Sequence, residues 1–179
     1  MTQRDANTPS SHSHDITVVI PLLNEEESLR PLINRIRTSL DHTAFTYEVV
    51  FVDDGSTDGS AAVLEELHAS GSNIKVIQFR RNFGKAAALN AGFKAAEGDL
   101  VFTLDADLQD DPVEIPRFIE ELESGELDVV SGWKKVRHDP WHKVIPSRVF
   151  NWLVSRLTGV KLHDHNCGFK CYRRGGVKE

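Results

Sequence analysis

The feature that most constrains the fold of this chain is a regular alternation of short, β-branched apolar runs with longer segments of helical periodicity. Four such strand–helix units follow one another, which favours a mainly parallel sheet with helices on both faces. We therefore predict an α/β fold in a single domain. The expected strands are 16–21, 48–52, 74–79, 100–104 and 128–131, and the expected helices are 29–40, 60–69, 85–96 and 112–123.

Polar residues follow the first four predicted strands at the points where such folds bind their ligands. In an open parallel sheet, ligands bind beyond the carboxyl ends of the strands. Agreement among four separate strand ends is stronger evidence for a site than any single motif. These residues are Asn24 and Glu25, Asp53 and Asp54, Arg80 and Arg81, and Asp105 and Asp107.

The fourth strand end carries the pattern Asp105-Ala106-Asp107, with Gln109 two residues further on. Pairs of this kind are common in surface turns. At a strand end, however, carboxylate and amide oxygens at alternate positions can all face one hard divalent cation. The sequence therefore predicts a Mg²⁺ or Mn²⁺ site, which suits an enzyme whose leaving group is a nucleoside diphosphate.

The second strand end combines turn chemistry with two acids. Gly55 and the segment 58–60 fit a turn followed by a helix cap. Turn and cap chemistry does not account for Asp53 and Asp54. A carboxylate at this strand end can accept hydrogen bonds from a nucleobase or a ribose hydroxyl.

The third strand end is basic. Arg80, Arg81 and Lys85 lie beside an expected helix N-terminus, a position that favours phosphate. The spacing of a P-loop is absent, and so is the glycine pattern of a dinucleotide-binding fold.

Composition and charge limit the remaining choices. A chain of 179 residues with 40% hydrophobic and 27% charged residues fits one globular domain. The net charge of -6 argues against nucleic acid as the main partner. Residues 1–15 have no apolar core of a signal peptide, so we expect a disordered tail. No apolar stretch is long enough to span a bilayer, and residues 175–179 look like a truncated end from which a transmembrane region is missing.

The last third of the chain is basic, and its segment 140–159 reads as an amphipathic helix with tryptophans. Such a helix fits a membrane surface or, equally well, a core helix with a solvated edge. Further on, Asp164 is a candidate general base. A zinc site is an alternative for the residues around it, although their spacing matches no common zinc module: His163, His165, Cys167 and Cys171.

Five motifs stand in order along the chain, at 20–26, 52–59, 82–85, 104–112 and 167–174. Together they resemble the family 2 glycosyltransferases with the GT-A fold, which is Rossmann-like. Within that family they are most similar to the polyprenyl-phosphate glycosyltransferases, such as dolichol-phosphate mannose synthases and bacterial undecaprenyl-phosphate glucosyltransferases. The resemblance covers residues 16–174, and it implies a GT-A catalytic domain over that range.

The resemblance also implies roles for individual residues. The donor is expected to be a nucleotide sugar of the UDP-glucose or GDP-mannose kind, with Mg²⁺ or Mn²⁺ on its diphosphate held by Asp105, Asp107 and Gln109. Asp164 matches a catalytically required acid, Asp107 is expected to be catalytic, and transfer is expected to invert the anomeric carbon. The expected substrate-binding residues are Pro21, Asn24, Glu25, Asp53, Asp54, Lys85, Asp105, Arg148 and Arg173.

The implied acceptor is undecaprenyl or dolichyl phosphate, and the implied location is the cytoplasmic face of a membrane. A homo-oligomer is left open. Three alternatives are kept beside this interpretation. They are a related transferase with a soluble or polysaccharide acceptor, a dehalogenase-like phosphotransferase with Asp105 as nucleophile, and a binding module without activity.

Overall fold

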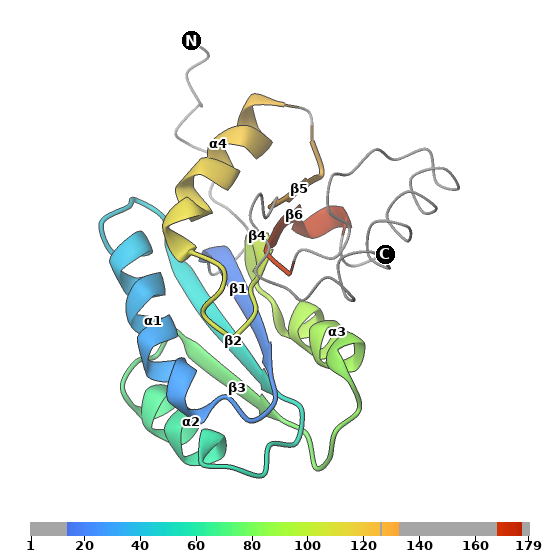
Figure 1. The fold of residues 1–179 in the computed structure, drawn as a ribbon. Coiled ribbons are helices and arrows are strands. Elements are labelled where there is room, and N and C mark those ends of the chain that lie inside the picture. Colours follow the sequence, from blue (N-terminus) through green and yellow to red (C-terminus); the bar gives the residue numbers. More distant parts are fainter. Residues whose placement is uncertain (1–13, 126, 133–167, 177–179) are drawn as a thin grey trace, which may run out of the picture.

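A sheet of six strands forms the centre of the protein within residues 14–125, 127–132 and 168–176, which are the residues described by this computed structural model (Figure 1). The strand order is β3-β2-β1-β4-β6-β5. The first four strands run parallel, whereas β6 is antiparallel to both of its neighbours, so the predicted mainly parallel sheet is confirmed. The strands are β1 (His14–Leu22), β2 (Tyr47–Asp53), β3 (Ile74–Gln78), β4 (Gly98–Thr103), β5 (Val129–Ser131) and β6 (Lys170–Arg173).

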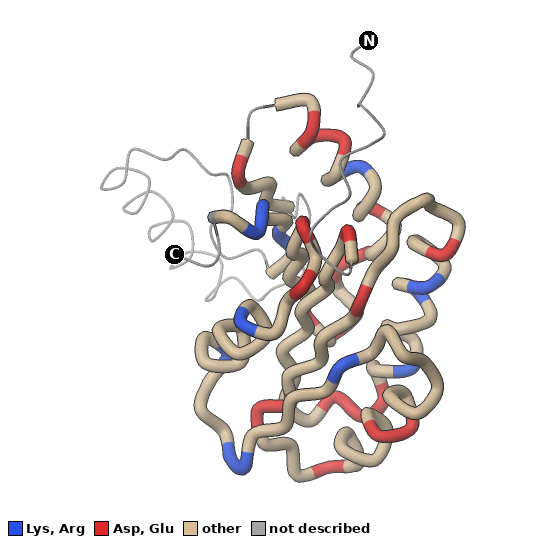
Figure 2. Tube along the Cα trace, turned by 180° about the vertical axis from the view of Figure 1, so that it is seen from behind, with Lys and Arg blue, Asp and Glu red and all other residues tan. Residues whose placement is uncertain are grey.

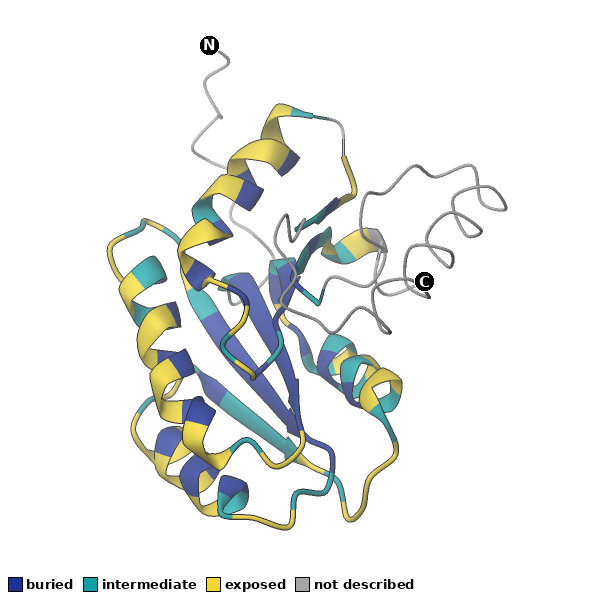
Figure 3. Ribbon diagram, in the orientation of Figure 1, coloured by how far each residue is buried: buried dark blue, intermediate teal, exposed yellow. Residues whose placement is uncertain are grey.

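Helices cover both faces of the sheet, as predicted (Figure 1). One face, with Phe51 and Phe102, packs against α1, α2 and α4, and the other face packs against α3 through Val19 and Val50. Figure 3 shows the buried central strands between helices whose outer sides are exposed. The helices are α1 (Glu26–Leu40), α2 (Ser60–Ala69), α3 (Lys85–Ala95), α4 (Ile115–Ser124) and the short 3₁₀ turns η1 (Pro112–Glu114) and η2 (Arg174–Gly176).

Several element starts differ from the prediction, most of all those of β1, α1, β4 and α4. Strand β1 begins at His14, because Asp15 bonds through its backbone and its carboxylate to Thr46, at 3.0 and 2.7 Å. Helix α1 begins at Glu26, because the carbonyl of Glu25 already accepts the amides of the first turn. The expected tail therefore gives up two residues to the sheet.

The direction of the strands decides what meets at the carboxyl edge of the sheet. Strands β1, β2 and β4 all end there. Because β6 runs the other way, its first residue, Lys170, pairs with Thr103 at the end of β4. The loop after β4 and the residues just before β6 are thus brought together at this edge. No described helix is long and apolar enough to cross a membrane.

Candidate active site

A pocket of about 280 Å³ opens at the carboxyl edge of the sheet, where β1 and β4 end and α3 begins. Six of the predicted site residues line it: Pro21, Glu25, Asp54, Lys85, Asp105 and Asp107. The other lining residues, to which the sequence assigned no role, are Leu22, Leu23, Asn82, Gly84, Ala88 and Ala106. The acids of three strand ends and one lysine therefore share a single concave surface.

An ion pair joins the two sides of this pocket. The Nζ atom of Lys85 lies 2.5 Å from Oδ1 of Asp105. The side chain of Lys85 is 55% exposed and that of Asp105 is 26% exposed, so water still reaches both. The ammonium thus lies directly beside the carboxylate of Asp105.

The carboxylate of Asp105 lies against Gly168, just before β6. A Cβ atom added at Gly168 would come closer than 3.0 Å to all three atoms of that carboxyl group. The carbonyl of Gly168 also accepts a hydrogen bond from Oγ1 of Thr103, at 2.7 Å. Glycine at this position thus forms one wall of the space that holds the acid.

Asp107 lies on the loop after β4, and its side chain is exposed. Its Oδ1 accepts a hydrogen bond from the amide of Gln109 at 3.1 Å. Between them, Leu108 has a φ of 63°, a conformation that is unusual for a residue other than glycine. The backbone of Gln109 therefore shapes this loop, while its side chain is not among those lining the pocket.

The donor set fits a divalent cation. The carboxylates of Asp105 and Asp107 line the pocket. That of Asp105 lies against Gly168, and the ammonium of Lys85 lies beside it. Hard cations such as Mg²⁺ and Mn²⁺ bind carboxylate oxygens together with the phosphates of a ligand. Asp105 and Asp107 are the residues that would hold such an ion.

Asp54 fixes the loop from which Lys85 extends. Its two carboxylate oxygens accept the backbone N–H groups of Phe83 and Gly84, at 2.7 and 2.9 Å. Gly84 has a φ of 93°, which glycine adopts without strain and which turns the chain into α3. Asp54 thereby places the first residue of α3 at the pocket.

Asp53 is buried and is held by its own turn. Its Oδ1 accepts the backbone N–H and the hydroxyl of Ser56, at 2.9 and 2.6 Å, and its Oδ2 accepts the amide of Gln78 at 3.3 Å. It does not line the pocket. Turn chemistry, which the sequence assigned to the neighbouring residues, thus also involves Asp53.

The loop after β1 is tied to the loop after β2. Oδ1 of Asn24 accepts the amide of Thr57 at 2.8 Å, and the amide of Asn24 donates to the hydroxyl of Ser56 at 2.9 Å. Oε2 of Glu25 accepts the hydroxyl of Ser28 at 2.9 Å. Asn24 therefore holds these two loops together, whereas Glu25 also lines the pocket.

Arg173 lies away from the pocket. It pairs with Leu100, near the start of β4, so it is at the amino edge of the sheet. Its guanidinium donates to the carbonyl oxygens of Leu122 and Leu127, at 2.9 and 3.0 Å. The predicted contact of Arg173 with substrate is not supported by this placement, because antiparallel β6 carries the residue in the opposite direction.

Several predictions fall on residues outside the described ranges: Asp164, Arg148, the segment 140–159, and His163, His165 and Cys167 of the zinc alternative. The remaining zinc candidate, Cys171, is buried in the core of the sheet. Burial raises the pKa of its thiol to about 12. Cys171 is thus a core residue of the sheet that packs among apolar side chains.

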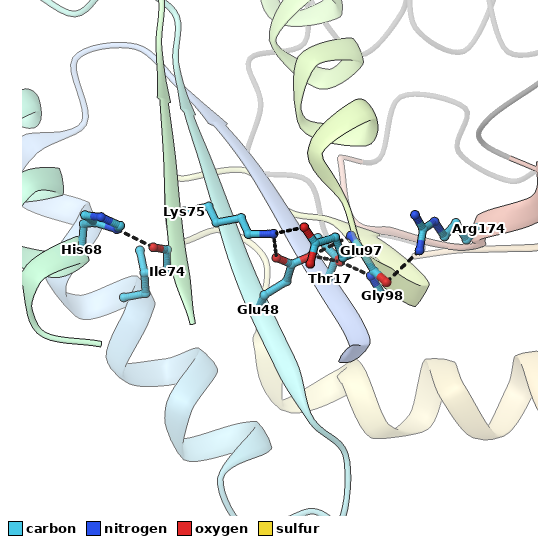
Figure 4. Close-up of polar contacts among 8 residues, drawn as sticks. All are labelled: Thr17, Glu48, His68, Ile74, Lys75, Glu97, Gly98 and Arg174. Carbon is cyan, nitrogen blue, oxygen red and sulfur yellow. Dashed lines mark hydrogen bonds and ion pairs between the residues drawn. The ribbon is translucent and has the colours of Figure 1, made fainter. Parts of the chain in front are cut away.

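A second acidic group lies at the amino edge of the sheet (Figure 4). Ligand atoms of His14, Glu48 and Glu97 lie within 4.8 Å of one another. Lys75 already bridges the two glutamates, at 2.8 and 2.7 Å. Because this group lies at the end of the sheet away from the pocket, it does not account for a cation at Asp105 and Asp107.

Taken together, the mainly parallel sheet and the acidic pocket at its carboxyl edge define an α/β domain with a pocket where such folds bind their ligands. The chain belongs to glycosyl transferase family 2, which matches residues 17–179. This assignment removes the dehalogenase-like alternative.

Two relatives are similar over most of the chain. A dodecaprenyl-phosphate galacturonate synthase from Rhizobium johnstonii is 40% identical over 98% of this chain and 52% of its own length. An undecaprenyl-phosphate 4-deoxy-4-formamido-L-arabinose transferase from Pseudomonas fluorescens is 44% identical over 90% of this chain and 47% of its own. The chain thus spans about half the length of these relatives.

Solved structures show the same fold. A glucosyl-3-phosphoglycerate synthase from Mycobacterium tuberculosis, in complex with UDP, is 26% identical, with a TM-score of 0.67 over 91% of this chain and 58% of its own. A complex of that synthase with Mn²⁺, UDP and phosphoglyceric acid gives a TM-score of 0.69 at 24% identity, over 91% of this chain and 57% of its own. The predicted GT-A class is therefore confirmed.

Proposed function

We propose that this domain transfers a sugar from a nucleotide-sugar donor to a polyprenyl phosphate, with inversion at the anomeric carbon and with a divalent cation at Asp105 and Asp107. One observation carries the proposal: both acids and Lys85 line the same pocket at the carboxyl edge of a family 2 glycosyltransferase sheet. The UDP complex of the similar synthase supports a uridine or other nucleoside diphosphate as the leaving group.

The chemistry of a phosphate acceptor suits this pocket. A lipid phosphate is already ionised near neutral pH, so its oxygen needs little help from a base to attack the anomeric carbon. The greater difficulty is to bring two phosphate-bearing substrates together and to stabilise the departing diphosphate. A bound cation supplies Lewis-acid stabilisation of the diphosphate. Lys85 adds a positive charge on the α3 side, and Asp54 holds the backbone of the preceding residue, Gly84, there.

The names of the relatives support the proposed acceptor. The two relatives at 40% and 44% identity are named for sugar transfer to dodecaprenyl and undecaprenyl phosphate. A soluble phosphate acceptor is the second candidate, because the structurally similar synthase is named for glucosyl-3-phosphoglycerate. We propose further that the enzyme acts at the cytoplasmic face of a membrane, where the predicted amphipathic segment 140–159 would lie on the lipid surface. Self-association remains an additional proposal.

Asp107→Asn tests the cation's role. The substitution removes a negative charge from an exposed side chain, so the fold is expected to persist, while the transfer rate falls by about 10²-fold or more. Transfer of radiolabelled sugar to undecaprenyl phosphate, or to 3-phosphoglycerate as the alternative acceptor, gives the readout. Calorimetry with UDP and GDP, with and without EDTA, measures the cation requirement.

Asp128→Asn is the matched control, because it makes the same chemical change at an exposed position near the amino edge of the sheet. Wild-type turnover by Asp107→Asn, or nucleotide binding that is indifferent to EDTA, would contradict the cation's role. Transfer only to 3-phosphoglycerate would replace the lipid acceptor with the soluble one.

A further inference from the structure

Lys85 occupies a position that helix stability does not explain. It is the first residue of α3, and no acid stands in the first turn of that helix. The amino end of a helix carries a partial positive charge, so a cation there is unfavourable. The partner that offsets this charge is Asp105, whose Oδ1 lies 2.5 Å from the ammonium.

Asp105 is also one of the two acids that would hold the divalent cation. A divalent ion at the carboxylate would lie within a few ångströms of the ammonium and repel it. The lysine and the ion therefore compete for the same carboxylate. We propose that Lys85 is an internal counter-ion, which holds Asp105 while the pocket is empty and yields it to the cation when a diphosphate offers the ammonium another partner.

The surroundings of Lys85 allow this exchange without a change of fold. Asp54 fixes the backbone at Gly84, whereas the side chain of Lys85 is 55% exposed on a flexible stem. The ammonium can thus swing from Asp105 to a diphosphate in the same pocket while α3 stays in place. The helix amino end beside it favours an anion as well.

The inference rests on the proposed function and adds a consequence to it. Cation binding without nucleotide must displace the ammonium, so it is weakened. With a diphosphate present, the ammonium gains a phosphate partner and the weakening disappears. Cation and nucleotide therefore strengthen each other's binding, and by linkage the factor is the same in both directions.

Calorimetric titration with Mn²⁺ alone, and then with Mn²⁺ in the presence of UDP or GDP, tests the exchange in the wild type and in Lys85→Met. The variant is expected to bind Mn²⁺ alone about three- to ten-fold more tightly than the wild type, because one repelling charge is gone. It is expected to bind Mn²⁺–nucleotide more weakly, so the mutual strengthening falls. Lys85→Arg, which keeps the charge, is expected to behave like the wild type for Mn²⁺ alone.

Lys94→Met is the matched control, since it removes the same charge from an exposed position near the other end of α3. Asp105→Asn in the Lys85→Met background is expected to abolish the gain, which locates the ion at Asp105. Unchanged or weaker Mn²⁺ binding by Lys85→Met, with nucleotide-assisted binding intact in the wild type, overturns the counter-ion role alone. Failure of the wild type to bind Mn²⁺ with either nucleotide overturns both this role and the proposed cation.

Discussion

At the residue scale, the acid most central to the pocket depends on a neighbour that has no side chain. Gly168 precedes β6 and lies against the carboxyl group of Asp105, while Thr103 bonds the carbonyl of the same glycine. A methyl group there has to push either the carboxylate or the backbone of β6 aside. The position of Asp105 is thus set from two sides, by Lys85 and by Gly168.

Gly168→Ala is therefore expected to weaken Mn²⁺ binding about ten-fold, because the added methyl group displaces the carboxylate from its position. Calorimetry measures the affinity, and the midpoint of urea unfolding checks that the fold persists. Gly175→Ala is the control, since a Cβ there meets nothing within 4 Å. Equal Mn²⁺ affinities of Gly168→Ala and the wild type would show that Gly168 does not position the carboxylate of Asp105.

At the scale of the elements, a polar network fastens the amino ends of the parallel strands, opposite the pocket (Figure 4). Glu48 of β2 is fully buried, and its Oε1 accepts the hydroxyl of Thr17 and the amide of Glu97, both at 2.7 Å. Lys75 of β3 neutralises Glu48 at 2.8 Å, and Thr17 also accepts the amide of Gly98 at 2.8 Å. The network thus connects β1, β2, β3 and β4.

Lys75→Met is expected to destabilise the domain by about 2 kcal/mol, because it leaves a buried carboxylate without its counter-charge; the figure allows for the partial exposure of the lysine. Urea unfolding measures the loss. Replacing Glu48 as well, in Lys75→Met/Glu48→Gln, is expected to restore part of the stability. A double variant no more stable than the single one would mean that the charge of Glu48 is not the cause. Nucleotide binding at the opposite edge should stay unchanged.

At the scale of the whole molecule, the loop between β3 and α3 contributes Asn82 and Gly84 to the pocket, and basic residues gather at its tip (Figure 2). They are Arg80 and Arg81, both exposed, and the guanidinium of Arg81 lies 4.9 Å from the centre of the Phe83 ring. The sequence predicted this basic strand end and its place beside α3. This prediction was possible because the ends of strands and the starts of helices depend on residues that are close together in the sequence.

The order of the sheet and the fine structure of the pocket were harder to predict. The strand–helix alternation indicates neither that β6 inserts between β4 and β5 nor that it runs antiparallel. For that reason the sequence does not indicate that Arg173 lies at the amino edge of the sheet, away from the pocket. The contacts Lys85–Asp105 and Gly168–Asp105 join segments that are distant in sequence, so only the packed sheet shows that they share one carboxylate.

Alkaline pH should weaken the whole domain. Burial raises the pKa of Cys171 from 9.0 to about 12, and it raises the pKa of Tyr172 as well. Burial, together with the hydrogen bond and charge of Asp41, raises the pKa of Tyr47 to about 12. A group whose pKa is higher in the folded state contributes stability below its unfolded pKa, and this contribution is lost as the pH rises towards the folded value.

The free energy of unfolding is therefore expected to fall from about pH 9 upwards, with Cys171 alone accounting for about 2–3 kcal/mol by pH 11. Urea unfolding at intervals from pH 8 to pH 11 gives the curve. Cys171→Ser starts from a lower stability, because a hydroxyl replaces a buried thiol, but its curve should be flatter above pH 9 by the contribution of one titrating group. Parallel curves for the variant and the wild type would show that the thiol ionises as readily in the folded domain as in the unfolded chain.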